Sequence, residues 1–447
     1  MLHIVISISR FALVILFAFY TYSCFGALKS GISEEKQDFL YCRQTLCMYL
    51  FLLIANGIMF LTTFDRRIVF MLGMEYVYFI LVSLIYKHIY RRASLSLTNN
   101  MCMLLSVSFV ILTRLSFEKA YKQLVIAAFA LVVTCLIPLL VSKLKFWNHL
   151  TYVYALVGIL GLGIVAIAGN TSYGAKLSMT VGGVSLQPSE IIKILFVFFV
   201  ASMLYEEPDE KKLKLVTVIA GFHVVLLIAS RDLGGAGIFF LTYLVMLFAA
   251  TKKLLYLFAG ILSGAVGLVM AYFLFSHVRV RVMAWKDPLS VVDGAGYQVS
   301  HSLFAIGTGG WFGSGLYQGM PQKIPVVEKD FIFSAISEEL GGVFALCLIF
   351  ICISCFLMMF NIAMQIHDPF YKLIALGLGT VYATQTFLTL GGVIRFIPST
   401  GVTLPLVSYG GSSLVSTMTL FAIIQGLYVL RGGEMWKKRD EAAGIRK

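Results

Sequence analysis

The stretch "EKDFIFSAISEELGGVFALCLIFICISCFLMMF", residues 328–360, joins a group of acidic side chains to a long apolar run. The acids are Glu328, Asp330, Glu338 and Glu339, although charged residues make up only 13% of the chain. A bilayer core takes about 20 apolar residues per helix. The run therefore predicts a membrane-spanning helix over 341–361, with the four carboxylates gathered where it begins.

The same apolar pattern recurs along the chain. Hydrophobic residues are 59% of the 447, and the mean hydropathy is +0.90. The runs are near-continuous, unlike the alternating strands of an outer-membrane barrel. They predict an all-α polytopic membrane protein with about thirteen spans: 4–27, 46–63, 68–87, 101–116, 123–142, 149–169, 189–205, 213–229, 235–250, 253–275, 341–361, 370–394 and 411–431. The first lacks a clear cleavage site, so it is interpreted as a retained span and not as a signal peptide.

The chain has a net charge of +13, and its basic residues lie beside the spans. This placement favours a membrane surface over nucleic acid as the partner. Basic residues occupy alternate loops: Arg91, Arg92, Lys143, Lys145, Lys211, Lys212, Lys214, Lys252 and Lys253. The positive-inside tendency places these loops and the C-terminus in the cytoplasm. The N-terminus is then outside, and Arg66 and Arg67 are exceptions on the external side.

This orientation leaves the longest loop, 276–340, outside. It begins with Arg279 and Arg281, which either snorkel to outer headgroups or clamp an anionic lipid head such as a pyrophosphate. The glycine-rich stretch 294–319 either lets backbone approach a ligand or permits re-entrant turns.

Further polar candidates lie at helix edges. Glu190 and Lys193 are interpreted first as an i,i+3 pair in a first helical turn, and Asp232 as an N-cap. Asp330 differs, because an ionisable group at the entry of a span is usually functional or paired, and partial burial raises the pKa of a carboxyl towards that of a general base. Of Glu338 and Glu339, one can pair with a cation from another helix.

Several motifs occur in an order that resembles the SEDS family of shape, elongation, division and sporulation proteins, which includes FtsW, RodA and SpoVE. The motifs cover roughly residues 100–431 and are "QPSEIIK" at 187–193, "DLG" at 232–234, "DP" at 287–288, "GAGYQ" at 294–298, "AIGTGG" at 305–310, "DFIFSAISEELG" at 330–341 and "GVTLPLVSYGGSS" at 401–413. Thr403, where RodA-like members tend to have proline, favours an FtsW-like member. "IPVVEKD" at 324–330 departs from the family's Leu-Pro-Glu and moves its acid to Glu328.

The resemblance implies a ten-helix core with a large external loop between its seventh and eighth helices. It implies a peptidoglycan glycosyltransferase that polymerises lipid II at the outer face of the bacterial cytoplasmic membrane, in division or elongation, with a class B penicillin-binding protein as partner. The essential aspartate of the family falls on Asp330. Other family cavity residues fall on Glu190, Lys193, Asp232 and Arg281, with Lys119 where arginine is usual, and Ser408 and Tyr409 of the last motif are further candidates.

The residues fit this chemistry independently. A sugar hydroxyl needs one carboxylate base to attack an anomeric carbon, and a pyrophosphate leaves readily once cations neutralise it. A divalent cation, Mg²⁺ or Mn²⁺, can assist, and no organic cofactor is expected. A lipid II transporter and a non-catalytic scaffold for a transpeptidase are the alternative functions, but the polar residues gather at one face and do not follow a path through the membrane.

The predicted organisation is therefore an N-terminal three-helix membrane extension over 1–90, a core over 91–431 and a basic cytoplasmic tail over 432–447. The extension is expected to hold no clustered polar residues within the membrane and to serve packing or partner docking.

Overall fold

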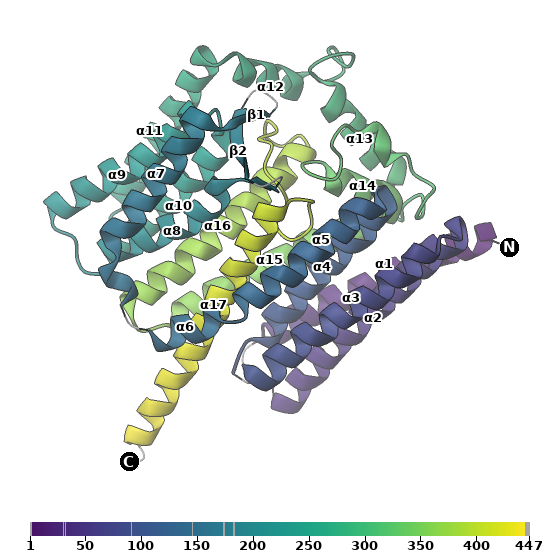
Figure 1. The fold of residues 1–447 in the computed structure, drawn as a ribbon, viewed down its shortest axis with the longest axis horizontal. Helices are drawn as coiled ribbons and strands as arrows, with labels where there is room; N and C mark the ends of the chain where they lie inside the picture. Colours follow the sequence, from purple (N-terminus) through teal and green to yellow (C-terminus); the bar gives the residue numbers. More distant parts are fainter. Residues whose placement is uncertain are drawn as a thin grey trace. The chain divides into compact units, whose positions relative to one another are not determined.

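The computed structural model describes residues 2–29, 31, 33–90, 92–144, 146–172, 175–181 and 184–442, and most of them are helical (Figure 1). The N-terminal elements are α1 (Leu2–Ala27), α2 (Glu34–Thr63), α3 (Arg66–Leu84), the π-helix η1 (Ile85–Ile89), α4 (Leu95–Leu115), α5 (Phe117–Thr134), α6 (Ile137–Lys143) and the short 3₁₀ turn η2 (Trp147–His149). Then follow α7 (Thr151–Ala168), β1 (Asn170–Ser172), β2 (Ala175–Val181), β3 (Val184–Leu186), α8 (Pro188–Leu204), α9 (Glu210–Ala229), α10 (Leu233–Thr251) and α11 (Leu254–Leu274). The last are α12 (Ser276–Lys286), α13 (Tyr297–Gly309), the 3₁₀ turn η3 (Pro321–Lys323), α14 (Ile332–Leu340), α15 (Gly342–Gln365), α16 (Pro369–Val393) and α17 (Gly411–Ala442).

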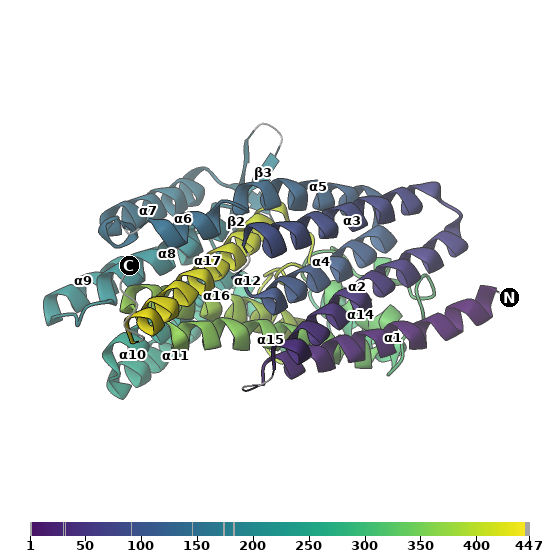
Figure 2. The ribbon, with the colours of Figure 1, turned by 90° about the horizontal axis from the view of Figure 1, so that it is seen from below.

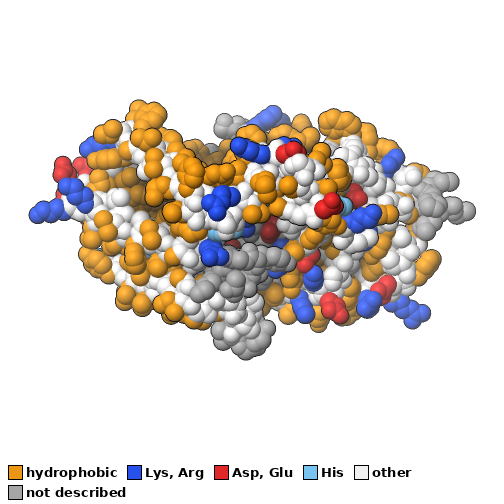
Figure 3. Space-filling view, turned by 90° about the horizontal axis from the view of Figure 1, so that it is seen from above, with side chains coloured by type: hydrophobic (Ala, Val, Ile, Leu, Met, Phe, Trp, Pro, Cys, Tyr) orange, Lys and Arg blue, Asp and Glu red, His pale blue; other side chains and the backbone are white. Residues whose placement is uncertain are grey.

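Twelve helices in the described residues are long and apolar enough to cross a membrane, and they coincide with twelve of the thirteen predicted spans. The remaining predicted span forms α8, which has 17 residues. Large hydrophobic side chains cover much of the face shown in Figure 3. Water-soluble proteins rarely expose such continuous apolar surface. The prediction of a multi-pass helical membrane protein is confirmed.

The chain forms two compact units, which are described separately. Unit 1 comprises residues 1–131, 280–358 and 386–410, and unit 2 comprises 132–279, 359–385 and 411–447. The predicted extension, 1–90, thus belongs to unit 1 together with segments of the core.

In unit 1, α1, α2 and α3 pack side by side along α4 (Figure 2). The expectation that this extension holds no clustered polar residues is wrong. Tyr20 donates a hydrogen bond to Oδ1 of the fully buried Asn100 on α4 at 3.0 Å, and Asn100 Nδ2 donates to Ser354 Oγ on α15 at 3.2 Å. Asn56 Nδ2 donates to Glu75 Oε2 at 3.0 Å between α2 and α3, both buried. Polar groups lacking water must pair within the protein, so these bonds fix the register of the extension.

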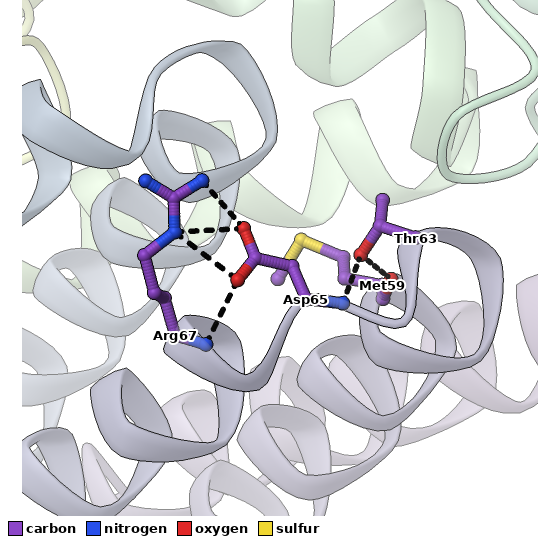
Figure 4. Close-up of polar contacts among 4 residues, drawn as sticks. All are labelled: Met59, Thr63, Asp65 and Arg67. Atoms are coloured by element: carbon purple, nitrogen blue, oxygen red, sulfur yellow. Dashed lines mark hydrogen bonds and ion pairs between the residues drawn. The ribbon is translucent and has the colours of Figure 1, made fainter.

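The turn between α2 and α3 accounts for Arg67, one of the two exceptional arginines (Figure 4). Asp65 caps α3 by accepting a hydrogen bond from the Arg67 backbone N–H at 2.9 Å, and its carboxylate binds the Arg67 guanidinium at 2.7 Å. The Arg67 guanidinium also lies 5.1 Å from the Phe117 ring centroid, at the start of α5. The charge of Arg67 is therefore neutralised locally, and the turn contacts the helix that carries Lys119.

Unit 2 is centred on α8, whose buried residues contact α7, α9, α10 and α17. The loop after α7 forms a three-stranded antiparallel sheet, β1–β2–β3, which the all-α prediction did not include. Because α17 continues to Ala442, part of the predicted tail is helical. Arg91, Lys145 and residues 443–447, which belong to the predicted basic loops and tail, lie outside the described residues.

The segment predicted as the long external loop, 276–340, is largely helical and contains α12, α13 and α14. Its glycines explain why so irregular a sequence packs tightly. Gly313 has a φ of +78°, and a Cβ there would lie 2.3 Å from the carbonyl oxygen of Glu339. Only glycine combines this backbone conformation with so close an approach. The glycine-rich stretch thus packs its backbone directly on α14, which favours the turn interpretation over ligand approach.

Candidate functional site

Asp330 lies in the short connection that precedes α14 and is half-buried. It makes no hydrogen bond and no salt bridge with any residue that the structure describes. Burial raises the pKa of its carboxyl to about 6, although Arg281 and Lys329 act in the opposite direction. A carboxyl with a pKa of about 6 is mostly ionised at neutral pH. With no hydrogen-bond donor bound to it, the carboxylate can accept a proton from a substrate hydroxyl.

Arg281, on the part of α12 in unit 1, lies beside this carboxyl. A Cβ added at Gly401 would lie 3.5 Å from Arg281 Nη2 and 3.6 Å from Asp330 Oδ2, so both side chains rest against the same glycine. Gly401 has a φ of +75°, and Arg281 Nη1 donates to the Ser399 carbonyl at 3.1 Å. The segment 399–401 therefore positions a cation next to the candidate base without forming a salt bridge that would hold the acid ionised.

The backbone before Asp330 is held by the last loop of unit 1. Ser408 Oγ donates to the Lys329 carbonyl at 2.5 Å, and the Tyr409 N–H donates to the Glu328 carbonyl at 2.8 Å. Gln123 on α5 donates to the Ser408 carbonyl at 3.1 Å. Ser408 and Tyr409 thus position the connection that carries Asp330.

Lys119, near the start of α5, forms a 2.5 Å ion pair with Glu328. Burial raises the pKa of Glu328. The hydrogen bond from Lys119 and the neighbouring cations together lower this pKa by more than burial raises it, so the net effect is a decrease. Unlike Asp330, Glu328 therefore has a cation that neutralises its charge. Lys119 thus contacts Glu328, which lies two residues before Asp330 in the chain.

The other two acids of the opening stretch are structural. Buried Glu339 forms a salt bridge with Arg114 of α4 at 2.9 Å, and Glu338 Oε1 accepts from the Met320 N–H at 2.8 Å. The Arg114 guanidinium also lies 4.2 Å from the Tyr317 ring centroid. The expectation that one of these glutamates pairs with a cation from another helix is confirmed for Glu339. Of the four acids, Asp330 alone has neither a hydrogen bond nor a salt bridge to a described residue.

The glycine-rich loop between α13 and α14 is further braced by α1. Arg10 Nη1 donates to the Gly313 carbonyl at 3.0 Å, and the Phe11 and Phe312 rings lie 5.3 Å apart. The next residue, Ser314, donates from its N–H to the Glu338 carbonyl at 2.9 Å. The N-terminal extension is therefore connected through this loop to the helix that follows Asp330.

The remaining candidates lie in unit 2. Glu190 and Lys193 form the predicted i,i+3 ion pair at 2.5 Å, both are buried, and Lys193 Nζ also donates to Gln385 at 2.6 Å. Asp232 caps α10 as expected by accepting from the Gly235 N–H at 2.8 Å. Arg279 is exposed and donates to the Phe273 carbonyl at 3.1 Å. The clamping of an anionic lipid head by Arg279 and Arg281 stays a prediction.

Sequence reasoning missed Arg114, Gln123 and Gly401. Gly401 opens the last motif, but its closeness to Asp330 depends on the fold. Arg114 and Gln123 lie far from their partners in sequence and had no local signal. Among the described residues, no three His, Cys, Asp or Glu side chains cluster as a metal site.

Comparison with known proteins gives a consistent result. Residues 87–430 match the family described as cell cycle protein, which comprises FtsW, RodA and SpoVE. "Peptidoglycan glycosyltransferase RodA" of Mycobacterium tuberculosis (strain ATCC 25618 / H37Rv) is 35% identical over 318 residues, 67% of each chain. "Probable peptidoglycan glycosyltransferase FtsW" of Aliivibrio salmonicida (strain LFI1238) is 33% identical over 331 residues, 70% of this chain and 81% of the relative.

Solved structures share the fold. A chain from a study of how a peptidoglycan synthase complex coordinates polymerization and crosslinking aligns with a TM-score of 0.64 at 24% identity, over 76% of this chain and 98% of that one. Thermus thermophilus RodA aligns with a TM-score of 0.56 at 23% identity, over 75% of this chain and 96% of that one. Both RodA and FtsW relatives match at similar identity, so the FtsW-like assignment stays a prediction.

Proposed function

This chain belongs to the FtsW/RodA/SpoVE family of cell cycle proteins, and on that premise we propose that it is a peptidoglycan glycosyltransferase whose general base is Asp330. The single observation that carries the assignment of Asp330 is its isolation. Among four neighbouring acids it alone has no partner in the described residues, and it lies beside Arg281.

The proposed reaction uses lipid II as donor and acceptor. Asp330 takes the proton of an acceptor sugar hydroxyl as the oxygen attacks the anomeric carbon of the donor, and the bond from that carbon to the polyprenyl pyrophosphate breaks. A single displacement of this kind inverts the anomeric configuration. Arg281 stabilises the charge that develops on the departing pyrophosphate. Lys119, which Glu328 neutralises, contributes less.

A divalent cation fits this site only with help from the substrate. Asp330 supplies one carboxylate, and Mg²⁺ is commonly held by one or two carboxylates together with substrate phosphates. Such an ion would add positive charge next to the pyrophosphate. Its requirement is tested by chelation and readdition in the polymerisation assay.

The site is proposed to face the outside of the bacterial cytoplasmic membrane, because lipid II is polymerised there and the basic loops at the opposite helix ends favour a cytoplasmic location. A class B penicillin-binding protein is the proposed partner. The described fold resembles a chain from a study of a synthase complex that couples polymerization to crosslinking, which supports this pairing.

The deciding experiment reconstitutes the purified chain with such a partner in vesicles containing lipid II. We expect glycan polymer to appear and to depend on Asp330. If the vesicles move lipid II between leaflets but make no polymer, the transporter alternative is favoured. If they do neither while the partner's crosslinking is stimulated, the chain is a scaffold.

The activity is expected to depend on pH through Asp330. A base acts in its deprotonated form, and the pKa of this carboxyl is raised to about 6, so the polymerisation rate should fall tenfold per pH unit below about 6 and level off above it. Initial rates between pH 4.5 and 8 measure this profile. A rate that stays constant from pH 8 down to pH 4.5 would indicate that Asp330 is not the titrating base.

The contact between the extension and the glycine-rich loop gives a second prediction. Arg10→Ala removes the hydrogen bond to the Gly313 carbonyl, and a hydrogen bond from a charged group contributes about 1.5–3 kcal/mol, so backbone amides over 309–320 should exchange at least about tenfold faster. Hydrogen exchange detected by mass spectrometry measures this change. Arg43→Ala, which removes a bond to Ser23 within the extension, is the control and should leave 309–320 unchanged. Equal exchange in both variants would show that α1 does not brace the loop.

A further inference from the structure

A cavity of about 400 Å³ lies between α2, the end of α3 with η1, and the start of α4, all within unit 1. None of its lining residues belongs to the candidate site. They are Asp38, Tyr41, Cys42, Thr45, Leu46, Tyr49, Ser83, Tyr86, Lys87, Leu95, Thr98 and Asn99. Asn99, which lines the cavity, lies near the N-terminal end of α4. Arg114, which pairs with Glu339 of α14, lies near the C-terminal end of α4. At 1.5 Å per residue this separation is about 20 Å, so the cavity and Asp330 belong to opposite leaflets.

The cavity is lined by one residue of each charge. Asp38 lies on α2 and Lys87 on η1, and both side chains are exposed. Neither forms a salt bridge or hydrogen bond with a described residue. Asp65 and Arg67, in contrast, neutralise each other at their own turn. A cavity with one cation and one anion complements a ligand that carries both charges.

The lining of α2 follows a single stripe of this helix, at positions i, i+3, i+4, i+7, i+8 and i+11: Asp38, Tyr41, Cys42, Thr45, Leu46 and Tyr49. The stripe is about 16 Å long. Its polar end is Asp38, near the start of α2, and Leu46 and Tyr49 lie further into the predicted span. This order, charge at the boundary and apolar surface towards the hydrocarbon, matches a headgroup followed by an acyl chain.

Lys87, the cation of the cavity, lies on an irregular helical turn. Lys87 and Tyr86 belong to η1, a π-helical segment at the end of α3. Short π-helical insertions are rare and frequently occur at functional sites. The wider turn places Lys87 at the cavity while Tyr86 is buried.

We propose that this cavity binds the headgroup of a phospholipid with a primary ammonium, the phosphoethanolamine class, in the leaflet opposite the candidate active site. Lys87 binds the phosphate and Asp38 accepts hydrogen bonds from the ammonium. One acyl chain runs along Leu46 and Tyr49. A choline headgroup cannot donate to Asp38, and a purely anionic headgroup leaves Asp38 facing a negative charge, so the cavity selects ethanolamine over both.

The test uses the purified full-length chain in detergent and follows its thermal unfolding midpoint as lysophospholipids are added. Lysophosphatidylethanolamine should raise the midpoint at roughly tenfold lower concentration than the choline or glycerol lysolipids. Glycerophosphoethanolamine, which lacks an acyl chain, should have no comparable effect. Equal responses to the three lysolipids, a stronger response to the glycerol form, or saturation by the chainless headgroup would each overturn the proposal.

Variants locate the effect. Asp38→Asn and Lys87→Gln should each remove the preference for the ethanolamine form, and the swap Asp38→Lys with Lys87→Asp should restore part of it. Both residues are exposed, so the midpoints without lipid should stay unchanged. Lys211→Gln, which removes an exposed cation on α9 that neither lines this cavity nor forms a salt bridge with a described residue, is the matched control and should keep the preference. If Asp38→Asn and Lys87→Gln keep it as well, the lipid binds elsewhere and the proposal fails.

Discussion

Replacing Asp330 by asparagine is expected to lower the rate of lipid II polymerisation by about 10²–10⁴-fold, the usual contribution of a positioned general base. Asparagine keeps the shape of the side chain but cannot accept the proton. The carboxyl has no hydrogen bond or salt bridge to lose among the described residues, so the fold should be as stable as before. Initial polymerisation rates of the reconstituted chain with its partner measure the loss.

The matched control is Asp293→Asn, which neutralises an exposed acid of the same segment, 276–340. It should leave the rate within about twofold, because a surface substitution away from the site changes little. A loss in both variants would indicate a general effect of negative charge in this segment. Full activity of Asp330→Asn, with unchanged expression and unfolding midpoint, would remove Asp330 from the reaction and leave the family assignment intact.

The sequence predicted the membrane architecture well because about 20 consecutive apolar residues have few alternatives to a spanning helix. It was less informative wherever contacts between distant residues decide the structure. The extension was expected to lack clustered polar residues, since Asn56 and Glu75 are isolated in sequence, yet they pair at 3.0 Å between α2 and α3. The segment 276–340 was expected to be the long external loop from the orientation of the basic loops, but the sequence did not show that it forms α12, α13 and α14 or that its glycines allow close packing on α14.

The candidate site shows the same division. A local motif identified Asp330, and an i,i+3 spacing identified the pair of Glu190 and Lys193. The sequence could not show which of four neighbouring acids stays without a partner, because the cations that pair with Glu328 and Glu339, Lys119 and Arg114, come from helices about 200 residues earlier in the chain. The functional distinction between the acids therefore depends on tertiary pairing, which a single sequence does not record.

Replacing Arg281 by glutamine is expected to have the second largest effect, and it acts in two separable ways. The loss of a cation next to the departing pyrophosphate should lower the rate at its pH plateau by about 10²-fold. Arg281 also lowers the pKa of Asp330 against the effect of burial, so its removal should move the acidic limb of the rate profile from about 6 to higher pH. Polymerisation rates between pH 4.5 and 9 measure both changes.

The comparison with Arg279→Gln makes this prediction specific, because Arg279 lies two residues earlier on α12, is exposed and donates to the Phe273 carbonyl. Its loss should leave the acidic limb in place. A merely structural contribution of Arg281 through the Ser399 carbonyl would lower the rate but would not shift the limb. An unchanged acidic limb in Arg281→Gln would therefore exclude electrostatic coupling to Asp330. A shift of the limb found in Arg281→Gln and absent from Arg279→Gln requires a direct electrostatic interaction between the Arg281 guanidinium and the Asp330 carboxyl.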